Sequence, residues 1–245
     1  MAQLPDDPEA TAHLRRQLAI VSEFADLKSR CRIPPDPGSE LANLSATLPD
    51  APVSIEESLV VGVECAYGAA HYLAHLLDKG GSFPPIVLSS SHRTALPGAG
   101  RTVYPIGPDD PDVRVSNSLV VLRQESNSLL QGIESFSAFT QLGALVPPRD
   151  VSLAWTKLNR EINSTGRPIG ERRTLTAMAT VIAQQLILDG YTVPNAQELL
   201  ADEVEWVWHA HSGTAHAFAW PPACPPILVP RRLPCPATSM LSSAL

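Results

Sequence analysis

The sequence predicts a mostly α-helical protein: a bundle of five to seven helices with proline-rich loops and a disordered C-terminal tail. Two observations support this prediction. Long segments repeat apolar residues at helical spacing, while few segments alternate with a period of two. Prolines and glycines separate these segments. We therefore expect a single helical domain over residues 1–220, followed by a separate tail over residues 221–245.

Capping residues and prolines mark the expected helix boundaries. Asp7 and Pro8 supply an N-cap and a first helical residue for the first helix, which must end before the segment IPPDPG. Ser54 and Glu57 have the spacing of a capping box, and they open a second long helix that Gly80 ends.

The second half of the chain repeats this pattern. An Asp-Pro pair at position 110 opens a long helix over 110–143. Three further helices are predicted at about 150–163, 170–189 and 194–217. These segments complete the helical body.

Three segments do not fit the helical pattern. The stretch PPIVLSSS at 84–91 is the best strand candidate. Residues 33–53 are rich in Pro, Asp and Ser and predict a linker or long loop. The tail at 221–245, PPACPPILVPRRLPCPATSMLSSAL, contains too many prolines for a helix, so we expect it to be disordered.

Composition narrows the functional class. The net charge is −7, and the basic residues are scattered along the chain with no run longer than a pair, which disfavours an extended contact with nucleic acid. The four cysteines form no Cys-x-x-Cys pair, as expected for free thiols in a reducing cytoplasm. No signal peptide or membrane-spanning run is visible. We expect a cytoplasmic protein without a cofactor, whose partner is an unknown protein or a second copy of itself.

The most chemically suggestive segment is WHAHSGTAHAFAW at 208–220. On a helix, His209 and His216 share a polar stripe with acidic residues, and a solvent-exposed face explains them. His211 lies on the opposite, apolar face beside Trp208. A histidine there is either packed and hydrogen-bonded or held as a general base or ligand. His211 is therefore our first functional candidate.

A second polar stripe lies on the helix that Ser54 opens. His71 and His75 are four residues apart, so both rings can lie on one face with Glu64. A facing helix with Glu205 and His209 would complete a zinc or iron site. Neither helix has the usual Glu-x-x-His signature, and two solvent-exposed faces explain the stripes equally well.

Two segments, HRTALPGAGRTVYPIGPDDPDVRVSNSLVVLRQE and EWVWHAHSGTAHAFAW, resemble parts of uncharacterised helical proteins encoded in actinobacterial genomes. The resemblance implies a helical architecture. It covers roughly residues 55–220. The second segment carries the shared pattern in Trp208, Ser212, Gly213, His216 and Trp220.

This sequence departs from the pattern of those proteins at Pro97 and Pro105. A proline inside a helix removes one hydrogen bond and clashes with the preceding turn. We therefore expect the helix around Arg93 and Arg101 to be broken.

The Ser-Gly-x-x-His end also resembles, distantly, the HEPN helical superfamily, which includes ribonucleases and nucleotide-modifying toxins. That family carries an Arg-polar-x-x-x-His motif, but no arginine lies a few residues before His211 or His216. An enzyme of this kind would need the fold to bring Arg93, Arg101 or Arg114 to the histidine, so that arginine binds phosphate and histidine transfers the proton.

No catalytic motif is complete. The sequence therefore favours a soluble helical module that acts through an interaction surface or by binding a small molecule. A HEPN-like enzyme and a metal-binding bundle are the alternatives.

Overall fold

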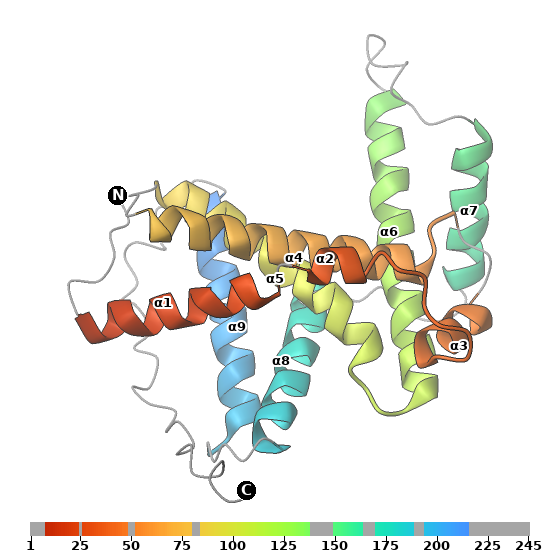
Figure 1. Cartoon of the computed structure of the whole chain (residues 1–245). Helices are drawn as coiled ribbons and strands as arrows, with labels where there is room; N and C mark the ends of the chain where they lie inside the picture. Colours follow the sequence, from red (N-terminus) through yellow and green to blue (C-terminus); the bar gives the residue numbers. More distant parts are fainter. Residues whose placement is uncertain are drawn as a thin grey trace, which may run out of the picture.

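The computed structural model describes residues 8–24, 26–48, 52–79, 84–137, 149–163, 170–188 and 194–215 (Figure 1). The described residues are mostly helical and contain no strand, which confirms the predicted fold class. His216 and the predicted tail lie outside these residues. The helices are α1 (Pro8–Glu23), α2 (Leu27–Arg30), α3 (Glu40–Thr47), α4 (Ile55–Asp78), α5 (Pro85–Ile106), α6 (Pro111–Ser137), α7 (Arg149–Asn163), α8 (Glu171–Leu188) and α9 (Ala196–Ala215).

The predicted helix starts are confirmed where local capping signals mark them. The Ser54 amide donates to the Glu57 carboxylate at 2.9 Å, and the Glu57 amide donates to the Ser54 hydroxyl at 3.2 Å. This reciprocal pair is the capping box at the start of α4. Asp110 accepts a hydrogen bond from the Asp112 amide at 2.9 Å and caps α6.

The strand predicted at 84–91 is wrong, because these residues open helix α5. Pro97 and Pro105 lie inside α5 without ending it, so the break expected around Arg93 and Arg101 is also wrong. Each proline removes one backbone hydrogen bond. Helix α5 nevertheless contacts α4, α6, α8 and α9, and burial against four neighbours outweighs these losses.

In its described residues, 33–48 and 52–53, the segment 33–53 is more than a simple linker. It contains α3, whose N-cap Ser39 accepts a hydrogen bond from the Ala42 amide at 3.3 Å. Leu44 of α3 is buried, and Leu41 packs against the main core. Apolar contacts outside the segment, rather than its own composition, therefore stabilise this helix.

Helix α5 occupies the centre of the arrangement. It runs beside α4, and α8 and α9 pack against it and against each other (Figure 1). The α6 helix contacts α5 and pairs with α7 at the opposite end of the molecule, while α1 lies along α4. The position of α5 thus links the α8–α9 pair to the α6–α7 pair.

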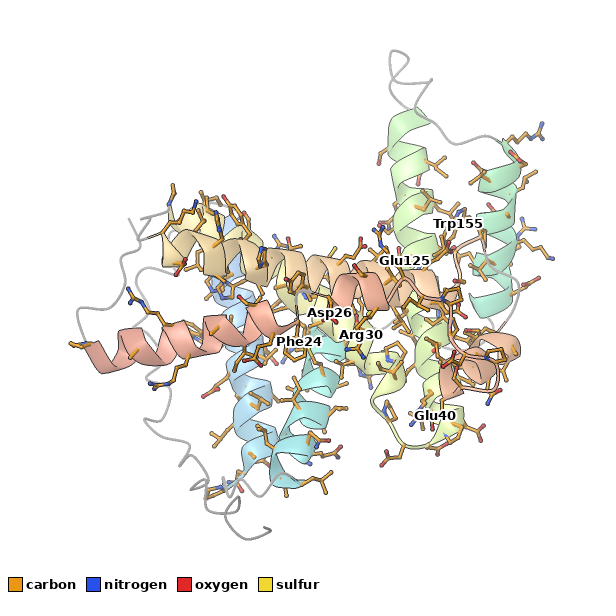
Figure 2. All side chains as sticks on the ribbon, viewed as in Figure 1. Phe24, Asp26, Arg30, Glu40, Glu125 and Trp155 are labelled. Atoms are coloured by element: carbon orange, nitrogen blue, oxygen red, sulfur yellow. The ribbon has the colours of Figure 1, made fainter. Side chains whose placement is uncertain are left out.

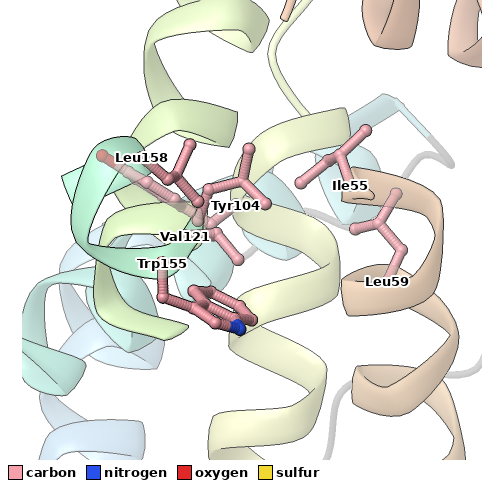
Figure 3. Packing of buried hydrophobic residues seen from close by; sticks show 7 residues of the cluster. Ile55, Leu59, Tyr104, Val121, Trp155 and Leu158 are labelled. Atoms are coloured by element: carbon pink, nitrogen blue, oxygen red, sulfur yellow. The ribbon is translucent and has the colours of Figure 1, made fainter. Parts of the chain in front are cut away.

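The main hydrophobic cluster joins α4, α5, α6 and α7. Trp155 lies between α6 and α7 in Figure 2, and its backbone carbonyl accepts a hydrogen bond from the buried hydroxyl of Ser126 at 3.2 Å. Burial of these large side chains provides the main apolar contribution to stability. Figure 3 shows the cluster, which consists of Ile55, Leu59, Tyr104, Val121, Leu122, Trp155 and Leu158.

Helices α4 and α5 come into close backbone contact at two glycines. A Cβ atom on Gly98 would lie 2.6 Å from the Gly62 carbonyl oxygen and 3.0 Å from the Ala66 amide nitrogen. A Cβ atom on Gly62 would lie 2.8 Å from the Gly98 carbonyl oxygen. Side-chain rotation cannot relieve contacts with backbone atoms, so any side chain here would push the two helices apart.

We predict that Gly98→Ala lowers the free energy of unfolding by roughly 1–3 kcal/mol, because overpacking outweighs the better helix propensity of alanine. The matched control is Gly68→Ala on α4, where an added Cβ meets no atom within 4 Å. That change should raise stability by about 0.5–1 kcal/mol. Chemical denaturation measures both values. If both substitutions change the free energy of unfolding equally, α4 and α5 do not approach each other closely at Gly98.

Candidate functional site

The first candidate site is a histidine pair between α5 and α9. The rings of His92 and His211 stack with centroids 4.2 Å apart and an angle of 10° between their planes. The Nδ1 atom of His211 also lies 3.1 Å from the hydroxyl oxygen of Ser89. Ser89 and His92 are three residues apart and therefore share one face of α5. His211 thus faces the protein interior, as the apolar face of its helix predicts.

The environment of His211 keeps its ring neutral near pH 7. Burial lowers the pKa of His211 from its usual 6.5 to about 4, and the neighbouring His92 contributes to the same shift. In His92, Nδ1 lies 2.9 Å from the Leu88 carbonyl oxygen, which only accepts, so Nδ1 carries the proton. The pair therefore consists of two rings fixed by hydrogen bonds to α5.

The histidine pair joins two helices and lacks an accessible nucleophile. Ser89 is only 2% exposed, so a substrate cannot reach its hydroxyl oxygen. Its hydrogen bond instead orients the ring of His211. This arrangement is that of a packed histidine, bonded to a serine hydroxyl rather than to a backbone carbonyl.

The arginines of the HEPN-like hypothesis take part in other contacts. Arg101 pairs with Glu125 of α6 at 2.8 Å. It follows His92 by nine residues, which corresponds to about 13 Å along α5. Arg114 donates to the Pro108 carbonyl and forms an ion pair with Glu40 at 2.5 Å. Arg93 also takes part in contacts of its own. These contacts place Arg101 and Arg114 with partners other than His211.

The residues of the proposed metal site lie on helices α4 and α9, which do not contact each other within the described ranges. Glu64 accepts a hydrogen bond from the Nε atom of Arg32 at 2.8 Å. His71 stacks on Tyr67 with ring centroids 5.5 Å apart, and the side chain of His75 is exposed. The α4 residues of this set therefore face partners or solvent.

On α9, Glu205 pairs with Arg172 of α8 at 2.6 Å, and His209 lies 3.7 Å from the same carboxylate. In the part of the chain that the structure describes, no three His, Cys, Asp or Glu side chains come close enough to hold a metal ion. The two polar stripes thus remain separate, and the metal hypothesis gains no support from their placement.

The second candidate site is a groove of about 1240 Å³ between α4 and the segment that contains α3. Residues from the end of α2, from α3 and from the ends of α5 and α6 complete its lining. Its walls are largely apolar, and Ile33, Val61 and Ile106 are exposed by 67%, 52% and 44%. Apolar side chains of the lining include Ile33, Leu41, Leu44, Val60, Val61 and Ile106.

Two ion pairs connect the α3 side of the groove to the rest of the protein. Arg32 contacts Glu64 of α4 at one end, and Glu40 of α3 contacts Arg114 of α6 at the other. The Arg114 side chain is only 18% exposed, but its partner Glu40 is 82% exposed, so both ion pairs are open to solvent. These contacts hold the α3 segment against α4 while the groove between them stays open.

A hydroxyl network holds an ionised carboxylate in the groove lining. Burial would raise the pKa of Glu56, but hydrogen bonds from Ser45, from its own backbone and from Ser54 keep the pKa below its ordinary value. Ser45 belongs to α3 and Glu56 to α4, so this contact also joins the two walls of the groove.

The sequence prediction missed both the partner of His211 and the groove. Ser89 and His92 are three residues apart, so they lie on one face of a helix. Because residues 84–91 were predicted as a strand, this spacing was not recognised. The groove forms by packing between segments that are distant in the chain, and neither segment has a local motif for it.

No family model matches the chain, and no curated protein or solved structure matches it. Among the described helices, none is both long enough and apolar enough to cross a membrane. The groove and the histidine pair are therefore the features that can indicate a function.

We predict that acidification weakens the fold through His211. Because burial lowers its pKa to about 4, the unfolded chain binds a proton that the native state does not, and stability decreases as the pH falls from 6.5 toward 4. In urea unfolding, the stability difference between the native protein and His211→Gln should narrow over this range. Leu199→Gln, at an exposed position on α9, is the control, because it removes no titratable group, and its effect should stay constant over this range. A pH-independent difference for His211→Gln would contradict a half-buried, neutral His211.

Proposed function

We propose that the protein is a soluble, cytoplasmic binding module whose ligand is a small, largely apolar molecule held in the groove between α3 and α4. The observation that supports this proposal is the groove itself, with its apolar walls and three strongly exposed aliphatic side chains. Exposed aliphatic side chains gathered in one concave region are typical of binding sites rather than of ordinary surface.

The size of the groove supports a small molecule. Ligand sites typically enclose about 300–1000 Å³ and combine apolar walls with a few polar groups. The groove is somewhat larger, at about 1240 Å³, and open to solvent, and its polar groups are confined to arginine and glutamate side chains and a few hydroxyls. These properties fit reversible binding of a molecule that remains partly hydrated.

The histidine pair is less suited to the central role. The 2% exposure of Ser89 leaves no route for a substrate, and the described contacts of His211 are with Ser89 and His92. We therefore propose that the pair positions α9 against α5.

The unpaired thiols of Cys31 and Cys65 agree with a reducing compartment.

We predict that an environment-sensitive apolar dye binds the full-length protein with an increase in fluorescence, and that Val61→Asp abolishes this increase. The substitution places a charge in the wall of the groove at a position that is already 52% exposed, so it should not disturb folding. Fluorescence titration with equal protein concentrations measures the effect.

The matched control is Val113→Asp, which makes the same change at a residue of α6 that is 41% exposed and does not line the groove. This variant should bind the dye as the native protein does. If Val61→Asp and Val113→Asp bind the dye equally well, the dye binds elsewhere and the proposed function is wrong.

A further inference from the structure

We propose that the ligand of the groove carries a single anionic group, a carboxylate or an equivalent anion, which Arg30 binds at the α2 end. This inference rests on the proposed function and specifies its ligand class: an elongated apolar molecule with one acidic end. The charges that line the groove, taken one by one, lead to this assignment.

Three arginines and four glutamates line the groove, and most of them already have partners. Arg32 and Glu64 form one ion pair, and Arg114 and Glu40 form another. Within the described ranges, the exposed guanidinium group of Arg30 makes no hydrogen bond or ion pair with another residue. Arg30 is thus the lining cation available for a ligand.

The two remaining glutamates of the lining, Glu56 and Glu57, lie near the start of α4, away from Glu64. Glu57 accepts the Ser54 amide in the capping box, and Glu56 accepts hydrogen bonds from Ser45 and Ser54. Both precede Glu64 on α4 by seven or eight residues, which corresponds to about 10–12 Å along the helix. Since Glu64 contacts Arg32, the carboxylate at the α2 end of the groove is that of Glu64, which is already paired, and Glu56 and Glu57 lie further along α4.

Arg32 strengthens the anion-binding character of the α2 end. Its Nε and Nη2 atoms donate to one oxygen of Glu64, and the side chain is 60% exposed. A guanidinium group has five donors, so Arg32 retains free N–H groups toward solvent. In Figure 2, Arg30 lies on α2, away from Glu40 at the start of α3. The α2 end of the groove thus carries two guanidinium groups and one carboxylate, that of Glu64, and is positive overall.

The apolar part of such a ligand would extend along α4. The lining residues of α4 run from Glu56 to Glu64, a distance of about 12 Å along the helix axis. Val60 and Val61 lie within this span, and Leu41 and Leu44 line the groove from α3. An amphipathic molecule could then place its anion on Arg30 and its chain between the two walls.

The test uses full-length protein with a bound apolar dye and three competitors of equal chain length: decanoate, 1-decanol and decylamine, all below their micellar concentrations. We expect decanoate to displace the dye at about tenfold lower concentration than decanol, the ratio that one charge-assisted hydrogen bond provides. Arg30→Gln should remove this advantage and leave displacement by decanol unchanged. The control Arg15→Gln changes an exposed arginine of α1 outside the groove and should keep the advantage.

The outcomes separate this inference from the proposed function. Equal displacement by decanoate and decanol, or stronger displacement by decylamine, would overturn the anionic ligand while leaving an apolar binding site intact. If the Arg30→Gln variant still prefers decanoate to decanol, Arg30 does not bind the anion, and the inference is overturned while the apolar site remains. If no competitor displaces the dye and Val61→Asp does not affect its binding, the proposed function itself fails.

Discussion

The close contact between α4 and α5 at Gly62 and Gly98 determines where the rest of the structure can lie. Backbone atoms of the two helices approach each other there, and the neighbouring side chains of Thr102 and Cys65 leave no room for a further Cβ atom, so the spacing of the pair is fixed by sterics. Thr102 also donates a hydrogen bond to the Gly98 carbonyl, four residues earlier in α5, at 3.0 Å, at the same contact. Because α5 packs against α4, α6, α8 and α9, a change in this spacing would propagate to all four.

The two candidate sites lie at different positions along α5. Thr102 and Ile106 contribute to the groove, and Ser89 and His92 contact His211 of α9. Ten residues separate His92 from Thr102, or about 15 Å along the helix. The histidine pair is thus too far from the groove to act on a ligand there, and it stabilises the α5–α9 contact instead.

The sequence allowed prediction of the features that depend on neighbouring residues. The capping box of Ser54 and Glu57 and the inward face of His211 follow from local spacing, and both were correct. The path of α5 could not be predicted, because Pro97 normally breaks a helix and only the surrounding packing compensates for it. The error also hid His92, since its role depends on the helical face that it shares with Ser89.

The groove is the feature least accessible to sequence analysis. Ile33 and Val61 are separated in the chain, and nothing local indicates that residues of the α3 segment return to cover α4. The metal hypothesis failed to gain support for a related reason. His71 and Glu205 each lie on a regular polar stripe, but whether two stripes face each other depends on helix packing, and α4 and α9 do not meet within the described residues.

The most direct test of binding in the groove is to locate a bound apolar ligand on the chain. A photoactivatable aliphatic diazirine would be crosslinked to the full-length protein, and the labelled peptides would be identified by mass spectrometry. We expect labelling of the α3 segment and of α4 between Glu56 and Glu64, the residues that line the groove. Labelling confined to other exposed apolar positions, such as Ile187 and Leu188 of α8, would contradict it.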